Sequence, residues 1–190
     1  MVGRLGNQMF IAAAAHSLAL DNNDRVIYPN SIGGICPTPD ETIVHRKTIF
    51  RNLHYTNDLS FLKFVYSESP SMEFKEIDYR ENLFIKGYFQ SENYFKHNRE
   101  HIIKLFSPQR EIEEFINKKH SSLIDSSEHV SVHVRRGDYL KLSDYHNVLG
   151  KGYYQKAMKD YDGAKFVFFS DDIEWCRETF KGHNSVFIEK

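Results

Sequence analysis

The last third of the chain carries the pattern that most limits its fold. Residues Val130 to Arg135 alternate, with valines at one set of positions and Ser131, His133 and Arg135 at the other. Such alternation predicts a β-strand with two different faces. Apolar patterns further predict a helix over 153–161, a buried strand over 165–169, a helix over 172–180 and a strand over 185–188. Strands alternating with helices predict an α/β fold with a parallel, Rossmann-like sheet.

The first two thirds carry weaker patterns. We expect a helix over 6–20, a short strand over 25–28, a loop over 30–40, brief strands or helices within 41–81, a strand over 82–88 and a helix over 92–106. Ser107 and Pro108 resemble a helix start, with a hydroxyl N-cap followed by proline in the first turn. The α/β prediction therefore rests mainly on the last third.

Composition excludes several broad classes of protein. The chain has 190 residues, of which 41% are hydrophobic and 27% charged, as in ordinary globular domains. The formal net charge of −1 argues against a general binder of nucleic acid or membrane surfaces, so any anion site must be local. Cys36 and Cys176 lie far apart without metal-type spacing, which favours two buried thiols in a reducing compartment.

The amino-terminal residues lack the features of an export signal. No basic region precedes an apolar one, and the longest apolar stretch, Met9 to Ala15, is too short to cross a bilayer. We therefore expect a cytoplasmic protein. An association with lipid-linked glycans at the inner face of the membrane is compatible with that expectation.

A short glycine turn opens the first predicted helix, at Gly3-Arg4-Leu5-Gly6-Asn7-Gln8. Such turns let backbone N–H groups and the positive end of a helix dipole approach an anion. The alternative is an ordinary helix start at Gly6 or Asn7. The glycine spacing does not match the dinucleotide-binding fingerprint, which argues against an unrelated Rossmann-type oxidoreductase.

Two polar segments follow predicted strands of the last third. His133-Val134-Arg135-Arg136-Gly137-Asp138 ends the first strand. One arginine there can bind a phosphate while the other pairs with Asp138 or reaches a second phosphate. A structural arginine–aspartate pair is the alternative. Ser170-Asp171-Asp172 ends the second strand. Asp171 with Glu174 suits a helix cap, which leaves Asp172 to accept hydrogen bonds from a guanine edge.

A fourth segment, GYFQSENYF from Gly87 to Phe95, mixes polar and aromatic residues between a predicted strand and helix. It suits either a ligand-facing loop or a turn with two buried aromatic side chains. With all four segments in order, the chain resembles the α-1,2-fucosyltransferases of glycosyltransferase family 11. The motif from His133 to Asp138 is shared with other fucosyltransferases. The glycine turn and the GYFQSE segment narrow the resemblance to the α-1,2 family.

The resemblance implies a two-lobed GT-B-like architecture with Rossmann-like parallel sheets. Residues 1–125 would form the acceptor-side lobe, and 126–190 would begin the donor-binding lobe. It also implies inverting transfer of fucose from GDP-fucose to the 2-hydroxyl of a terminal β-galactoside, without a metal or other cofactor. Family members have a strand before the glycine turn and continue past the Ser-Asp-Asp segment, so we expect a chain cut short at both ends, with an incomplete donor lobe.

The resemblance also assigns roles to individual residues. Arg135 and Arg136 would hold the diphosphate and stabilise the leaving GDP, with Asp138 orienting an arginine. His133 and Asp172 would face the guanine, and Gly6 and Asn7 would lie against the β-phosphate or the fucose. The alternative function is an inactive remnant that binds carbohydrate or nucleotide.

Overall fold

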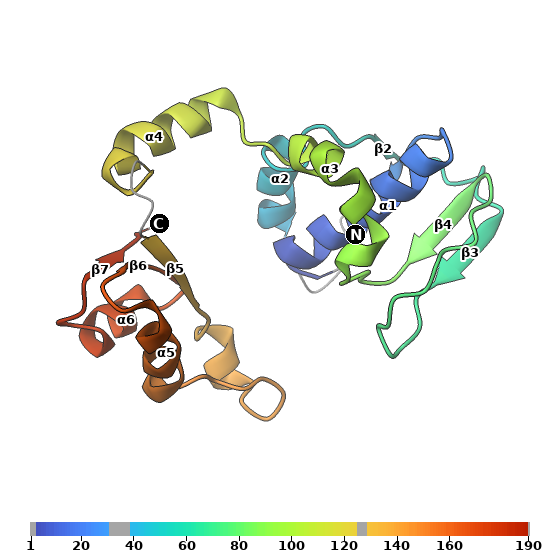
Figure 1. The fold of residues 1–190 in the computed structure, drawn as a ribbon. Helices are drawn as coiled ribbons and strands as arrows, with labels where there is room; N and C mark the ends of the chain where they lie inside the picture. The colour runs from blue at the N-terminus through green and yellow to red at the C-terminus, as the bar shows by residue number, and fades with distance from the viewer. Residues whose placement is uncertain (1–2, 31–38, 125–128, 190) are drawn as a thin grey trace. The chain divides into compact units, whose positions relative to one another are not determined.

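The computed structural model describes residues 3–30, 39–124 and 129–189 (Figure 1). They form helices and small parallel sheets, which confirms the α/β prediction. The chain divides into two compact units, Met1–Glu113 and Glu114–Lys190. The predicted boundary at residues 125 and 126 separates lobes by function, and it stays a prediction.

The first unit is built around helix α1. Its elements are α1 (Leu5–Asp21), β1 (Tyr28–Pro29), α2 (Pro39–Lys47), β2 (Tyr55–Thr56), β3 (Phe64–Ser67), β4 (Leu83–Lys86), the 3-10 turns η1 (Glu92–Tyr94) and η2 (Lys96–Asn98), and α3 (Arg99–Leu105). Ala12 of α1 belongs to a buried cluster with Tyr28 and Phe50, whereas Ile11 belongs to another with Phe89. The small alanine side chains let neighbouring elements approach α1 closely.

The sheets of this unit are short. β1 pairs in parallel with β2, and β3 pairs in parallel with β4. The strand expected over 25–28 is thus confined to Tyr28 and Pro29, whereas the one expected over 82–88 is present as Leu83–Lys86. The loop expected over 30–40 lies mostly outside the described residues, as does Cys36, and α2 begins at Pro39.

Two predicted helix boundaries were wrong. The helix expected from residue 92 begins as η1 and η2 and becomes α-helical only at Arg99. The buried hydroxyl of Ser17 on α1 contacts His97 Nε2 at 3.2 Å and Asn98 Nδ2 at 3.0 Å, so side-chain contacts with α1 hold the η2 turn. Ser107 donates its hydroxyl to the Ile103 carbonyl at the end of α3, so it does not cap the next helix, which begins at Arg110.

The second unit contains one three-stranded sheet. Its elements are β5 (His129–Val134), η3 (Asp138–Lys141), α5 (Lys151–Met158), η4 (Lys159–Tyr161), β6 (Lys165–Ser170), α6 (Ile173–Thr179) and β7 (Ser185–Phe187), and α4 (Arg110–Ile124) leads into it. The strands are parallel, as the sequence pattern predicted, and they lie in the order β5-β6-β7.

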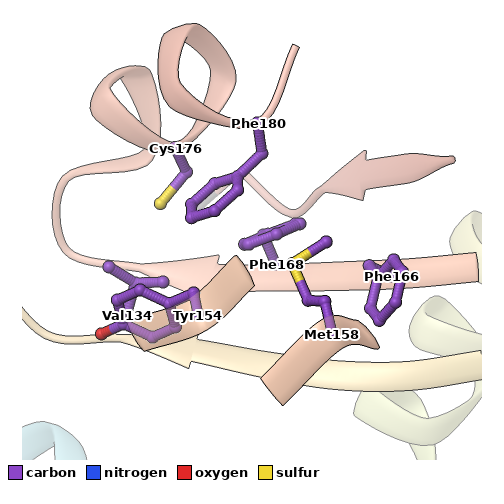
Figure 2. Close-up of a cluster of buried hydrophobic side chains, with 7 residues drawn as sticks. All are labelled: Val134, Tyr154, Met158, Phe166, Phe168, Cys176 and Phe180. Atoms are coloured by element: carbon purple, nitrogen blue, oxygen red, sulfur yellow. The ribbon is translucent and has the colours of Figure 1, made fainter. Parts of the chain in front are cut away.

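The core of this unit lies on one face of the sheet. Val134 is opposite Ser170 and Val132 opposite Phe168, so the valines of β5 share a face with Phe166 and Phe168. Figure 2 shows the cluster that α5 and α6 complete, with Tyr154, Met158, Cys176 and Phe180. Ser131 and His133 are exposed, which confirms the predicted alternation. Among the described residues, no helix is long and apolar enough to span a membrane.

Candidate functional site

The carboxyl ends of β5 and β6 bring two polar segments together. Val134, the last residue of β5, lies opposite Ser170, the last residue of β6. The Ser170 hydroxyl donates to the Val134 carbonyl at 2.8 Å and accepts from the Asp172 N–H at 2.9 Å. Because the strands are parallel and in this register, Arg135 and Arg136 leave the sheet beside Asp171 and Asp172.

Arg135 bridges two carboxylates. Its Nη2 lies 2.6 Å from Asp138 Oδ1, and its Nη1 lies 2.9 Å from Asp171 Oδ2. The guanidinium carbon also lies 5.5 Å from the ring centre of Tyr139. A carboxylate that holds the guanidinium fixes its orientation, and the role of Asp138 in donor binding stays a prediction.

Arg136 is held between a carboxylate and an aromatic ring. Its Nε lies 3.0 Å from Asp172 Oδ2, and its guanidinium carbon lies 3.9 Å from the ring centre of Trp175. The indole ring attracts a guanidinium that lies over its face, and this attraction limits the rotation of the guanidinium. Sequence reasoning did not assign a role to Trp175 or to Ser170. Ser170 ends β6 and Trp175 follows on α6, so the parallel pairing of β6 with β5 is the signal that could have found them.

Asp171 also shapes the backbone of the turn after β5. Its Oδ1 accepts from the Arg136 N–H at 2.9 Å. Burial by itself would raise the pKa of Asp171, but hydrogen bonds from the backbone of Arg136 and Gly137, with the Arg135 guanidinium, hold that pKa below its ordinary value. A Cβ at position 137 would lie 2.5 Å from Asp171 Oδ2, so a side chain there would force the Asp171 carboxylate to move.

The sequence predicted Asp171 as the cap of the following helix, and this prediction was wrong. Asp172, and not Asp171, is the N-cap of α6, since its Oδ1 accepts from the Trp175 N–H at 3.4 Å. Asp171 instead faces the end of β5, where it pairs with the Arg135 guanidinium and accepts from the Arg136 backbone N–H. The helix therefore starts one residue later than predicted, at Ile173.

His133 stands apart from the arginine–aspartate cluster, by which we mean Arg135, Arg136, Asp138, Asp171 and Asp172. It is exposed on the face of β5 opposite the core, in register with Phe169 of β6. Within the described part of the chain, no hydrogen bond or ion pair joins His133 to the cluster. Its guanine-side role stays a prediction.

Gly6 and Asn7 lie in the first turn of α1, in the first unit. Gly3 has a φ of 77°, and the buried Gln8 donates its amide to the Gly3 carbonyl at 2.8 Å, which closes the glycine turn. Gly6 is exposed, and Asn7 Oδ1 accepts from Gln90 Nε2 at 2.7 Å. A contact of these residues with the donor stays a prediction.

The GYFQSENYF segment combines the two alternatives left open by its sequence. Phe89 is fully buried and Tyr94 nearly so, as expected for a turn with two buried aromatic side chains. Gln90 between them is exposed and reaches the first turn of α1. The segment therefore both packs the core and presents a polar side chain.

The arginine–aspartate cluster can bind an oxyanion. A guanidinium has five N–H donors. In the contacts described above, Arg135 uses two nitrogens on carboxylates and Arg136 one, so further donors remain on both. The three carboxylates orient these donors and leave them for a ligand such as a phosphate. Among the described residues, no group of three or more metal-ligating side chains could hold a metal ion.

Comparisons with known proteins find similarity to sugar transferases. A family model described as Glycosyl transferase family 11 matches residues 1–189. The chain is 28% identical to an O-antigen biosynthesis glycosyltransferase of Escherichia coli over 98% of its own length and 76% of that protein. It is 33% identical to an alpha-1,2-colitosyltransferase of Escherichia coli over 53% of its length and 36% of that protein.

A mammalian relative adds a third comparison. A galactoside 2-alpha-L-fucosyltransferase of Bos taurus is 30% identical over 97% of the chain and 52% of that protein. The chain thus spans about half the length of this relative. No solved structure gives a significant match.

Proposed function

The chain belongs to glycosyltransferase family 11, and on that basis we propose that it is a galactoside α-1,2-L-fucosyltransferase. It takes fucose from GDP-fucose and transfers it, with inversion, to the 2-hydroxyl of a terminal β-galactoside. The bovine relative, a galactoside 2-alpha-L-fucosyltransferase, supports both the sugar and the acceptor of this proposal. A GT-B-like arrangement, with the donor bound by the lobe that begins near residue 126, belongs to the same proposal.

The arginine–aspartate cluster is the observation that carries this proposal. Breaking the bond between fucose and GDP places negative charge on the β-phosphate, and a preorganised pair of guanidiniums stabilises that charge. Arg135 and Arg136 supply the charge that a metal ion supplies in other transferases, so we expect transfer in the presence of EDTA. Asp138 and Asp171 hold Arg135, and Asp172 with Trp175 holds Arg136.

Asp172 can accept a hydrogen bond from the guanine and still keep its contacts with α6 and Arg136. Its Oδ1 caps α6 and its Oδ2 binds Arg136. Each carboxylate oxygen offers more than one acceptor direction, so a guanine N–H can still be accepted. The guanine would then lie beside β6, with the diphosphate toward Arg135.

A second candidate is a protein that binds the nucleotide or a glycan without turnover. The three carboxylates of the cluster outnumber its two arginines. A diphosphate must therefore compete with internal ion pairs, and this observation favours weak binding over catalysis.

Calorimetric titration with EDTA present separates these possibilities. We expect GDP and GDP-fucose to bind, and GDP-mannose and UDP-galactose to bind more weakly. A β-galactoside added with GDP-fucose should then gain one fucose by mass spectrometry. Binding without transfer would favour the second candidate, and a strict metal requirement would contradict the proposed charge stabilisation. A colitose nucleotide is the natural competitor, since one relative is named for colitose transfer.

A further inference from the structure

A cavity of about 550 Å³ lies within the first unit, apart from the arginine–aspartate cluster. Strands β1 and β4 both line it, whereas none of the described residues that line it belongs to their partners β2 and β3. The cavity is therefore on the unpaired side of both strands. Apolar residues of α1, of β4, of the segment before β1 and of the segment after β2 surround it, among them Ile11, Ala15, Ile27, Leu59, Leu83 and Ile85.

The backbone before and within β1 has unpaired groups on the side of this cavity. The N–H groups of Tyr28 and Asn30 donate to backbone carbonyls at and just before β2, at 2.8 and 2.7 Å. Successive residues of a strand direct their N–H and C=O groups to opposite edges. Ile27 and Pro29 therefore direct theirs away from β2, and both residues line the cavity.

Strand β4 repeats this arrangement on the other side. The carbonyls of Asn82 and Lys86 accept from backbone N–H groups just before and just after β3, at 3.0 and 2.8 Å. By the same alternation, Leu83 and Ile85 direct their backbone groups away from β3, and both residues line the cavity. Among the described residues, β1 pairs only with β2 and β4 only with β3. Two rows of unpaired backbone groups thus flank one cavity.

The side chains at the cavity favour an apolar occupant with acidic ends. Ile27 is 37% exposed and Leu59 is 41% exposed, so apolar surface there is open to a ligand. The charged residues that line the cavity in the described part of the chain are three cations and one anion: Arg25, Arg80, Lys86 and Asp24. An excess of cations attracts carboxylates to the ends of a bound chain.

We propose that this cavity binds one extended apolar peptide strand, which pairs with the free edges of β1 and β4 and joins the two small sheets. An exposed sheet edge binds a strand through main-chain hydrogen bonds, and pockets beside it select the side chains. A strand enclosed by apolar residues is a nearly continuous apolar run, rich in β-branched residues. The site lies wholly within the first unit and does not depend on the transfer reaction.

A synthetic strand peptide tests the site. Labelled Glu-Val-Ile-Val-Val-Ile-Glu should bind the 190-residue protein saturably in fluorescence anisotropy. N-methylation at alternate positions keeps the side chains but removes the N–H donors toward one neighbouring strand, so it should weaken binding by about tenfold or more. Absence of binding would overturn the proposal. Equal binding of the two peptides would also overturn it, since the cavity would then take any apolar molecule.

Hydrogen exchange read by mass spectrometry locates the peptide. Bound peptide should slow exchange about tenfold in 25–29 and 82–87, because the unpaired N–H groups of Ile27, Leu83 and Ile85 gain acceptors. Exchange in 129–189 should stay unchanged. Slowing confined to β2 and β3 would place the peptide on the outer edges of the two sheets and overturn the proposal.

A matched pair of variants tests the cavity itself. Ile27→Glu puts a carboxylate into the apolar wall and should weaken peptide binding by about tenfold or more. Ile43→Glu is the control, because Ile43 is 43% exposed on α2 outside the cavity, and it should bind as the wild type does. Equal binding by both variants would overturn the site. A stable dimer of the wild type that excludes the peptide would assign these edges to a second copy and likewise overturn the proposal.

Discussion

The two units of this protein organise polar side chains in different ways. In the second unit the polar residues are charged, and they stand at the carboxyl ends of two paired strands, with Val134 opposite Ser170. In the first unit, side-chain hydrogen bonds join segments that lie far apart in sequence. Ser17 meets His97 across 80 residues, and Asn7 meets Gln90 across 83. The first arrangement follows from sheet register, whereas the second depends on how the whole unit closes.

This difference also affects how each unit responds to protons. The first unit holds His16 on α1 near His54 and His101, with its Nε2 buried and without a hydrogen-bond partner among the described residues. Burial first, and then the neighbouring histidines, lower the pKa of His16 to about 4. The second unit stabilises its charges by pairing them. Burial thus keeps His16 of the first unit neutral, whereas pairing balances the charges of the arginine–aspartate cluster in the second.

Removing a core ring of the second unit should have the largest effect. Phe168 is fully buried and lies 4.6 Å from the ring centre of Phe180 and 5.2 Å from that of Phe187. Phe168→Ala should lower the free energy of unfolding of this unit by about 3–5 kcal/mol. Hydrogen exchange read by mass spectrometry should show lost protection in 129–189 and unchanged protection in the first unit.

The matched control for that experiment is the neighbouring ring. Phe169 is 42% exposed on the other face of β6, so Phe169→Ala should cost far less. Equal loss of protection in both units after Phe168→Ala would contradict this expectation, because it would show that the two units unfold together.

Removing an arginine of the cluster should have the next largest effect, on the donor. Arg135→Ala or Arg136→Ala should weaken GDP binding by about 2–5 kcal/mol, since each removes a charge-paired contact. Titration calorimetry measures this loss. Arg177→Ala is the control, because that residue pairs with Glu174 and Glu189 on the same unit outside the cluster. Normal GDP binding by both cluster variants would show that the diphosphate lies elsewhere.

Lowering the pH should have the smallest effect, a decrease in the free energy of unfolding of the first unit. His16 is neutral in the folded unit down to a pKa of about 4, whereas unfolded histidine has a pKa of 6.5. The unfolded state therefore binds more protons in between, so stability is complete above pH 6.5 and falls as the pH drops toward 4. We expect a loss of roughly 1–2 kcal/mol in urea unfolding.

A substitution isolates the histidine's contribution. His16→Gln cannot gain a proton in this range, so it should flatten the acid dependence of the first unit. His54 and His101, which face His16, stay in place as an internal control. An unchanged acid dependence in His16→Gln would assign the effect to other groups.

Sequence-based prediction of helices and strands was more accurate for the second unit than for the first. The strands and helices from residue 129 onward were predicted within a few residues, because alternation and helical periodicity are properties of the local backbone. The helix expected over 92–106 was only partly right, because contacts with α1 hold its first residues in 3-10 turns. Local periodicity contains no information on such distant partners.

For the candidate site, the sequence by itself determined the residue types and the strand ends that carry them. Two arginines after one strand and two aspartates after the next already indicated a local anion site. Only the tertiary structure decided the pairing: Asp171 with Arg135, and Asp172 with Arg136 and the start of α6. It also decided that Gln90 donates to Asn7, 83 residues away in sequence. Partners are chosen by register and chain closure, which depend on residues far apart in sequence.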